Sequence, residues 1–414
     1  MDNVEKKIKV LHVSGATLNS GAGYAAMLTH NALLKINVES KVLYLKEVGS
    51  LSHNVASYSA SGFNARISRL LNTTLERILI FLNREKKGGI FSPGFYGVNL
   101  KAHPFFEWAD IIHIHWANYG FVNIGDIALW KKPVVWTLRD MWAFTGGCHC
   151  SLECGRYKDY CGRCPILGSD NEQDLSYYGL IRKLKFLPQS NINWVSVSQS
   201  MRSDALKSKV LKNQEIDVIY SGVNCDSYEI HSKDYARSIL GLPKDQKIIL
   251  IGSANIRDEH KGFSYIQSAL RKLSLNILVI VFGAAELHDD EIPQKIINFG
   301  FINETNKLNL LYCSADIFLS PSLNEAFGKT FAEAQVSGLP VICFKNTGPE
   351  EIVEHLITGY AANYKDREDL LCGIEWAISF DFDRNYIRDR AISLFDIRES
   401  AGKYKGLYQK LLSR

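Results

Sequence analysis

The chain has 414 residues, of which 46% are hydrophobic and 22% are charged, and its formal net charge is +4. This balance is typical of a globular protein with two or more domains, and it excludes a chain whose charge alone would drive it onto nucleic acid. The longest apolar run, residues 78–82, is too short to span a bilayer, and the start MDNVEKK has no secretory signal, so we expect a cytoplasmic protein.

Apolar runs that are typical of strands lie at residues 9–15, 41–45, 110–116, 133–138 and 193–198, and then at 217–223, 247–254, 277–283, 295–302, 316–322 and 339–344. Most are continuous rather than alternating, which is typical of strands buried on both faces. Helical patterns between them predict parallel sheets with right-handed crossovers. We expect two doubly wound α/β domains, residues 1–198 and 199–394, with a C-terminal helix at about residues 395–414 that packs back on the first.

A glycine-rich turn follows the first predicted strand. Residues 21–26, GAGYAA, match the G-x-G-x-x-A fingerprint of dinucleotide-binding proteins. In that fingerprint the strand runs directly into the first glycine, whereas here residues 15–20 intervene. An acid is also expected about 20 residues later, and Glu47 lies too far along the chain. An NAD or FAD site is therefore the weaker interpretation of this turn.

The first half of the chain is basic. Residues 1–200 hold 22 Lys and Arg against 15 Asp and Glu, a balance of +7, and the remaining 26 against 29 give −3. An amphipathic stretch at residues 61–90 contributes Arg66, Arg69, Arg77, Arg84, Lys86 and Lys87 around Leu70, Leu71, Ile78 and Phe81. This stretch predicts either a helix on an anionic membrane surface or, as we favour, a core-facing helix with a basic solvent side.

Polar side chains stand at the ends of two predicted strands. We expect His113 and His115, in the strand at 110–116, to face opposite sides, with His115 turned toward the ligand edge of the sheet and His113 in the core. Arg139 and Asp140 follow the strand at 133–138. These two residues are either part of a binding site or an ion-paired strand end.

Five of the nine cysteines lie close together, at positions 148, 150, 154, 161 and 164, in a segment with few apolar residues. Clustered cysteines in a cytosolic chain favour metal or redox chemistry over structural disulfides. The C-x2-C end and a count of four ligands fit a structural zinc site made by Cys148, Cys154, Cys161 and Cys164. Reduced or redox-labile thiols are the alternative.

The stretch SLNEAFGKTFAEAQVSGLPVI, residues 322–342, places two acids eight positions apart. A turn ending in Gly328 leads into a helix at residues 329–337, whose free amides and positive end suit a phosphate. Glu333 lies one turn inside this helix, and because a carboxylate is repelled by phosphate, its natural partner is a diol. Glu325 precedes the helix and is expected to reach another part of the same ligand. A nucleotide sugar has this arrangement of groups.

The extended stretch SPSLNEAFGKTFAEAQVSGLPVI resembles the E-x7-E segment of the retaining GT-B glycosyltransferases, most of all family 4, the glycosyl transferases group 1. Further stretches are similar to landmarks of that family in the same order. They are SGATLNSGAGYAA (glycine-rich first loop), DIIHIHW (active-site histidine), VSVSQSMRSD with VIYSGVNCDSY (interdomain passage), SANIRDEHKGF (arginine and lysine segment) and TGPEEIVEHLITGYA (following helix). The resemblance implies the GT-B fold of two Rossmann-like domains.

The resemblance also implies roles for the donor site. Glu333 would hold the ribose hydroxyls, and Glu325 would face the transferred sugar and position it for catalysis. Backbone amides would assist at Phe327, Gly328, Lys329 and Thr330.

Other roles implied by the resemblance lie outside this stretch. Lys261 and Arg257 would neutralise the diphosphate, although Arg257 stands one position from the arginine of the family pattern. His115 would lie at the reacting centre, and Gly21 and Gly23 would let the first loop approach the donor. Arg139, Asp140 and the cysteine loop would lie on the acceptor side.

We therefore expect a metal-independent, retaining hexosyltransferase that acts in surface polysaccharide biosynthesis. Its donor is expected to be a UDP- or GDP-sugar, and its acceptor a lipid-linked glycan. We also expect peripheral contact with the inner face of the membrane and no nucleic acid partner. No catalytic cofactor is expected, since Asp381-Phe382-Asp383, a D-x-D metal pattern, lies far from the phosphate segment. The alternatives are a nucleotide-sugar epimerase of the same fold, an NAD-dependent oxidoreductase and a non-enzymatic sugar-binding protein.

Overall fold

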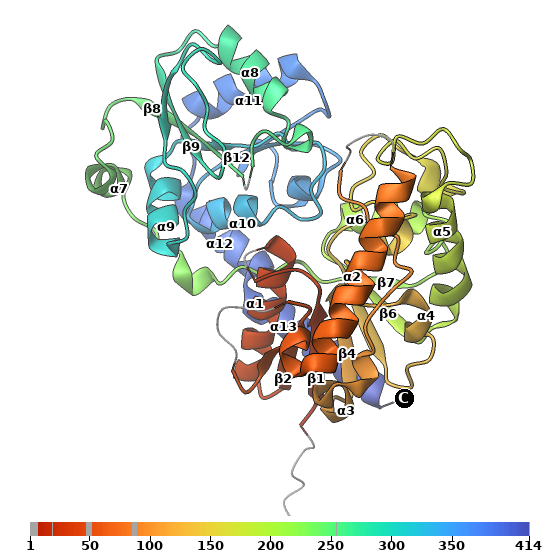
Figure 1. Ribbon diagram of the computed structural model, residues 1–414. Helices are drawn as coiled ribbons and strands as arrows, with labels where there is room; N and C mark the ends of the chain where they lie inside the picture. The colour runs from red at the N-terminus through yellow and green to blue at the C-terminus, as the bar shows by residue number, and fades with distance from the viewer. Residues whose placement is uncertain (1–6, 19, 47–51, 85–88, 254, 414) are drawn as a thin grey trace, which may run out of the picture. The chain divides into compact units, whose positions relative to one another are not determined.

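The computed structural model describes residues 7–18, 20–46, 52–84, 89–253 and 255–413 (Figure 1). The chain forms two compact units. The first holds the residues up to Gly222 together with those from Ile397 onward, and the second is Val223–Asp396. The first unit thus extends past the expected boundary at Ser198 because the strand at Ile216–Val218 pairs with its sheet.

The first unit contains a parallel sheet of seven strands in the order β3-β2-β1-β4-β5-β6-β7. The strands are β1 (Lys9–Ser14), β2 (Glu39–Tyr44), β3 (Val55–Ser57), β4 (Ile111–Trp116), β5 (Val134–Leu138), β6 (Ile192–Ser196) and β7 (Ile216–Val218). The helices are α1 (Gly21–Lys35), α2 (Phe63–Asn83), α3 (Pro104–Trp108), α4 (Ile124–Ile127), α5 (Leu175–Phe186), α6 (Gln199–Lys207) and the C-terminal α13 (Ile397–Leu412).

Helix α13 belongs to the core of this first unit. It packs against α1, and its Tyr404 and Tyr408 are buried together with Val10, Ile111 and Val135 of the sheet. The last segment of the chain therefore completes the unit in which the chain begins.

The second unit contains a parallel sheet of six strands in the order β10-β9-β8-β11-β12-β13. The strands are β8 (Lys247–Gly252), β9 (Ile277–Phe282), β10 (Lys295–Asn298), β11 (Ile317–Leu319), β12 (Val341–Phe344) and β13 (Gly359–Ala362). The helices are α7 (Lys233–Leu240), α8 (Phe263–Lys272), α9 (Thr305–Ser314), α10 (Lys329–Val336), α11 (Arg367–Ser379) and α12 (Arg384–Phe395). Apolar residues of α8 and α11 share one core cluster with the sheet, and Figure 1 shows both helices on the same side of it.

The predicted fold class is confirmed, since both sheets are parallel and Rossmann-like. Each predicted strand is present, but β7, expected in the second set, belongs to the first sheet. The sixth strand of the second sheet is β13, which the apolar pattern did not predict.

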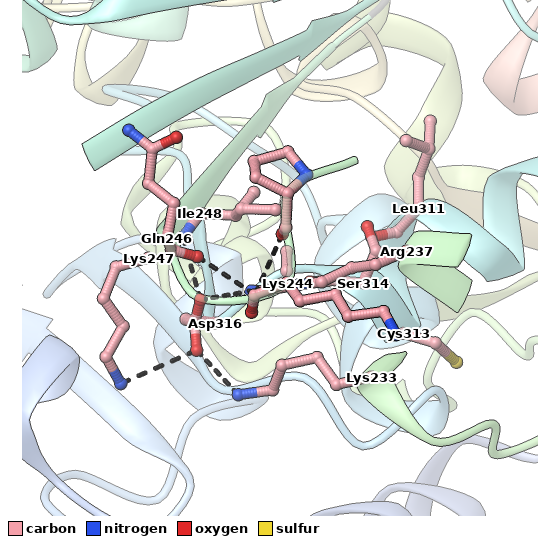
Figure 2. A network of polar contacts seen from close by, with 12 residues as sticks. Lys233, Arg237, Lys244, Gln246, Lys247, Ile248, Leu311, Cys313, Ser314 and Asp316 are labelled. Carbon is pink, nitrogen blue, oxygen red and sulfur yellow. Dashed lines mark hydrogen bonds and ion pairs between the residues drawn. The ribbon is translucent and has the colours of Figure 1, made fainter. Parts of the chain in front are cut away.

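A buried carboxylate ties α7 to the sheet of the second unit (Figure 2). Asp316, just before β11, accepts hydrogen bonds from Lys233 (2.7 Å), from Arg237 (2.8 Å) and from the backbone N–H of Ile248 (2.8 Å). Burial alone would raise the pKa of Asp316, but these donors hold it below its ordinary value. Lys247 approaches the same carboxylate at 3.7 Å.

Helix α2 differs from our expectation of a core-facing helix. Of its described residues, only Thr73 and Glu76 are buried. Its apolar side chains are exposed instead, among them Phe63 at 77%, Phe81 at 81% and Leu82 at 71%. Glu76 faces inward because it accepts backbone hydrogen bonds from residues 94–96. No helix in the described part of the chain is long and apolar enough to cross a membrane.

Candidate functional site

Both sheets reverse their strand order at one point, between β1 and β4 in the first unit and between β8 and β11 in the second. Loops that leave the carboxyl ends of the strands diverge there, and ligands of open α/β sheets bind in the resulting crevice. Several predicted site residues lie in or beside these loops, namely Gly21 and Gly23 after β1, Lys261 after β8 and Glu325 after β11. We consider the second unit first, because it holds the two acids.

The loops after β8 and β11 bring two predicted residues together. Gly262 has a φ of +73°, and a Cβ at this position would lie 2.0 Å from the carbonyl oxygen of Pro321, so only glycine lets the two loops approach this closely. As a result, Lys261 Nζ lies 2.7 Å from Glu325 Oε2. Both side chains remain partly exposed, at 21% and 25%.

The N-terminus of α10 is built around Gly328. This residue has a φ of +96°, and a Cβ here would lie 2.8 Å from the ring of Phe331 and 2.9 Å from Pro349. Among the described side chains, none caps this end of the helix by a hydrogen bond. The positive end of the helix dipole at this point suits an anionic ligand.

Glu333 lies one turn inside α10 and is 3% exposed. Its Oε1 is 2.8 Å from Lys329 Nζ, and the hydroxyl of Tyr312 donates to Oε2 at 3.4 Å. Burial, and then the nearby carboxylate of Glu333, raise the pKa of Tyr312 well above its ordinary value, so the hydroxyl keeps its proton. Tyr312 was not predicted, because an apolar helix such as α9 gives no sign of which side chain faces a neighbouring acid.

Arg257 has a different partner from the one we predicted. Its guanidinium forms a two-point ion pair with Glu291, at 2.5 and 2.7 Å, and also donates to the carbonyl of Glu286 at 2.8 Å. These hydrogen bonds lower the pKa of Glu291. A contact between Arg257 and a diphosphate would first require this pair to open.

In the first unit, the two predicted loop glycines differ in their surroundings. A Cβ at Gly23 would lie 2.0 Å from the carbonyl oxygen of Thr17, so this glycine is needed for the loop to close over the start of α1. Ser20 caps the helix by accepting from the N–H of Gly23 at 3.1 Å. Gly21 has open space around it in the described structure. Gly21 is therefore the position where the backbone can approach a ligand closely.

His115 is buried in a hydrogen-bonded chain. Arg139 donates to its Nδ1 from Nε at 3.1 Å, which leaves the proton of a neutral imidazole on Nε2, and this atom lies 2.8 Å from Nδ1 of His12. Burial, His113 and Arg139 together hold the pKa of His115 well below its ordinary value. Both ring nitrogens are thus occupied, and His115 positions Arg139. His12, which the sequence analysis missed, is the last residue of this row of hydrogen bonds. Its Nε2 has no hydrogen-bond partner among the described residues.

The expectation that His113 and His115 face opposite sides is wrong. Their ring centroids are 4.0 Å apart, because residues two positions apart share one face of a strand. His113 is hydrogen-bonded to Tyr408 and Thr137, both at 2.7 Å. Ligand atoms of His12, His113 and His115 lie within 4.8 Å of one another. Because Arg139 and the hydroxyls already use most of these nitrogens, the arrangement favours a neutral polar cluster over a metal site.

Asp140 also has close protein partners. It accepts from the indole N–H of Trp116 (2.6 Å), from the backbone N–H of Trp142 (2.9 Å) and from His149 (2.8 Å). Burial alone would raise the pKa of Asp140, but His149 and these donors hold it below its ordinary value. The carboxylate thus fixes the loop after β5 to the end of β4.

A basic pocket of about 520 Å³ lies beside these residues in the first unit. Its lining is Lys46, Arg69, Leu70, Thr73, Thr74, Glu76, Arg77, Ile80, Ser92 and Tyr119. Arg69 Nε is buried without a hydrogen-bond partner in the described structure. Tyr119 stacks edge-on against Trp116, the partner of Asp140, so the pocket adjoins the loop that follows β5. A second pocket of about 480 Å³ shares Lys46, Arg69 and Leu70.

Residues 232–393 match the model of the family described as glycosyl transferases group 1. This part of the second unit is therefore similar to that family. The matched residues include Lys261, Glu325 and Glu333, so the donor-side loops described above lie inside the family's region of similarity.

Several curated glycosyltransferases are similar to this chain. An uncharacterized glycosyltransferase of Methanocaldococcus jannaschii is 26% identical over 56% of this chain and 60% of its own length. A glycogen synthase of Caldicellulosiruptor saccharolyticus is 27% identical over 48% of this chain and 45% of its own length. The chain thus spans about half the length of these relatives. The colanic acid biosynthesis glycosyl transferase WcaC of Escherichia coli is 22% identical over 84% of this chain and 85% of its own length.

Solved structures show that this chain has the GT-B fold. Sucrose-phosphate synthase of Thermosynechococcus elongatus superposes with a TM-score of 0.69 at 17% identity, over 98% of this chain and all (100%) of that one. Anabaena HepE, solved in complex with UDP and glucose, superposes with a TM-score of 0.65 at 15% identity, over 97% of this chain and 100% of that one.

Proposed function

We propose that this chain is a retaining glycosyltransferase that moves a hexose from a UDP- or GDP-sugar to a glycan acceptor in surface polysaccharide biosynthesis. The observation that carries the proposal is the convergence of Lys261, Glu325 and Glu333 around the N-terminus of α10, at the switch point of the unit that matches the family. The naming of WcaC for colanic acid biosynthesis and the UDP complex of HepE support the choice of substrates.

In this proposal, the nucleotide sugar binds to residues that form two lysine–carboxylate pairs in its absence, Lys261–Glu325 and Lys329–Glu333. The diphosphate takes Lys261 and the amides at residues 327–330, Glu333 turns to the ribose diol, and Glu325 holds the transferred sugar. As the glycosidic bond breaks, negative charge grows on the leaving diphosphate, and a fixed cation and helix end stabilise this charge without a metal ion. Each such donor contributes about 3 kcal/mol to transition-state stabilisation.

We further propose that the acceptor carries an anionic group, of the kind found in lipid-linked glycans. The support comes from the 520 Å³ pocket, whose lining includes the cations Lys46, Arg69 and Arg77 and the apolar Leu70 and Ile80. These three cations outnumber the single acid of the lining, Glu76, so an incoming phosphate would meet an excess of positive charge. The exposed apolar side chains of the adjoining α2 suit a lipid surface at the inner face of the membrane.

Inorganic diphosphate tests this acceptor pocket when the donor site has first been weakened by Lys261→Met. In that background we expect diphosphate to stabilise the protein against heat, and we expect Arg69→Gln to lose this stabilisation while Lys212→Gln, an exposed cation of the same unit, keeps it. Equal stabilisation of both variants would place the anion elsewhere and contradict the pocket.

A panel of nucleotide sugars tests the proposed function as a whole. We expect one UDP- or GDP-sugar to raise the melting temperature and to release its nucleotide when an acceptor extract is added. Conversion of the donor sugar without acceptor would indicate an epimerase, binding without nucleotide release would indicate a sugar-binding protein, and reduction of NAD would indicate an oxidoreductase. Each of these three results would overturn the proposal.

A further inference from the structure

Four of the five clustered cysteines line one small cavity. The cavity has a volume of about 20 Å³, and the thiols that line it belong to Cys148, Cys154, Cys161 and Cys164. Cys150 is not among the described residues that line it. A space of this size holds one water-sized particle, which makes it large enough for a single metal ion.

The backbone holds Cys161 and Cys164 in place. Gly162 lies between them with a φ of +125°, and a Cβ here would lie 1.9 Å from the carbonyl oxygen of Glu172, so only glycine fits. The N–H of Cys164 donates to Asp174 at 2.8 Å, and Asp174 also caps the start of α5. The C-x2-C pair is therefore fixed to the first turn of a helix.

A buried cation lies next to the thiols. Lys183 of α5 is fully buried, and its ammonium group donates to the carbonyl oxygens of Trp142 and Thr145. Burial lowers the pKa of Lys183 to about 7, and the nearby Cys148 and Cys161 act against this shift. A zinc ion with four thiolates carries a net charge of −2, and a buried ammonium group partly offsets it.

We propose that Cys148, Cys154, Cys161 and Cys164 bind one structural Zn²⁺ ion. Binding converts four S–H groups to thiolates and releases four protons to solvent, with no change of oxidation state. Tetrahedral zinc with bonds of about 2.3 Å brings its sulfurs to about 3.8 Å from one another. Among the described residues, no three of these cysteine sulfurs lie within 4.8 Å of one another. The four thiols therefore draw closer together when they bind the ion.

The ion would stabilise the loop that orients Asp140. The carbonyl of Cys148 accepts from the hydroxyl of Thr145 at 2.6 Å, and the next residue, His149, contacts the carboxylate of Asp140. The carbonyl of His149 also accepts from the N–H of Met141 at 3.0 Å. The zinc site therefore supports the region beside the basic pocket through the backbone, and it has no role in the chemistry of the donor.

Metal analysis of the full chain tests this proposal without an activity assay. Protein purified under reducing conditions is expected to contain about one zinc ion per chain. Cys148→Ser and Cys161→Ser are expected to lose the ion and to lower the melting temperature. Cys150→Ser, in the same loop but outside the cavity lining, is the matched control and is expected to keep it.

Cobalt substitution covers the case in which the cysteine variants do not fold. Wild-type protein loaded with Co²⁺ is expected to show the intense absorption of a tetrahedral tetrathiolate site. A zinc-free wild-type protein that also fails to bind added Zn²⁺ would overturn the proposal. So would disulfides among the four cysteines in freshly purified protein, or a loss of zinc in Cys150→Ser equal to that in Cys161→Ser.

Discussion

At the scale of single residues, the proposed donor site already holds its cations and acids in pairs. Lys261 contacts Glu325, and Lys329 contacts Glu333. The first pair is about one fifth to one quarter exposed. Ion pairs that are accessible to water contribute little net stability, so a donor can open the Lys261–Glu325 pair at a small cost.

Lys261→Met tests the role of the exchanged cation. Removing the charge that faces the leaving diphosphate is expected to lower kcat by about 100-fold to 1,000-fold, the usual effect of losing one preorganised donor to a developing anion. Steady-state kinetics with the preferred nucleotide sugar measures this loss. Lys272→Met, which removes a cation paired with the exposed Glu368 in the same unit, is the control and should leave kcat unchanged. A fully active Lys261→Met enzyme would refute the assignment.

The sequence predicted the residue types at this site better than their contacts. Glu325 was predicted from its position before the helix at residues 329–337 and Lys261 from the resemblance to the glycosyltransferases, and the structure places them 2.7 Å apart. Arg257 was assigned by its position near Lys261, but a two-point pair with Glu291 is a contact between distant loops that the sequence does not encode locally. The error at His113 and His115 came from applying the strand period wrongly.

At the scale of secondary-structure elements, the attachment of α7 to the second sheet depends on Asp316. We expect Asp316→Asn to lower the free energy of unfolding by about 3 kcal/mol near neutral pH, since Arg237 would then be buried without its counter-ion. Denaturant titrations measure this loss. Glu368→Gln is the control. It breaks the ion pair with Lys272, and because the Glu368 side chain is 69% exposed, the variant should change stability little.

The difference in the free energy of unfolding between wild type and Asp316→Asn depends on pH in a defined direction. The pKa of Asp316 is lowered in the folded protein, so its stabilisation is fully present above the unfolded pKa of about 3.9 and disappears as the pH falls through the lower folded pKa. The gap in stability between wild type and Asp316→Asn should therefore shrink below about pH 4. A gap that is independent of pH would contradict the ionised state of Asp316.

Helix α2 supports a prediction about membranes. Its exposed Phe81 and Leu82, together with Arg69 and Arg77, should bind vesicles that contain an anionic phospholipid more tightly than neutral vesicles, with an affinity that falls as salt is added. Vesicle sedimentation measures the binding. Replacing both apolar residues by Ser should abolish it, whereas Leu129→Ser, an exposed leucine elsewhere in the unit, should not. Binding that survives loss of Phe81 and Leu82 would exclude α2 as the contact.

The elements missing from our prediction share a physical cause. Strands β3 and β13 have three and four residues, at the edges of their sheets, so each offers too few apolar positions for a pattern. Strand β7 was placed in the wrong sheet because a parallel strand is assigned by its neighbours and not by its own residues. The core strands β1, β4, β8 and β9 were predictable because both of their faces are buried.

At the scale of the whole molecule, each unit has its own switch point and its own chemistry. The second unit carries the acids and the N-terminus of α10, and the first carries the basic pocket and the cysteine loop. This division agrees with the charge of the units, since residues 1–222 and 397–414 hold 31 Lys and Arg against 19 Asp and Glu (+12), whereas residues 223–396 hold 17 against 25 (−8). It supports the proposal that donor and acceptor are bound by different units.

The affinity of Glu333→Gln for the preferred nucleotide sugar tests the central claim most directly. Calorimetric titration of wild type and variant compares the two, and the melting temperature without ligand confirms that the variant is folded. A carboxylate that accepts hydrogen bonds from a ribose diol contributes about 1.5–3 kcal/mol, so the dissociation constant is expected to rise by about 10-fold to 150-fold. An unchanged dissociation constant in a folded Glu333→Gln protein would contradict the account.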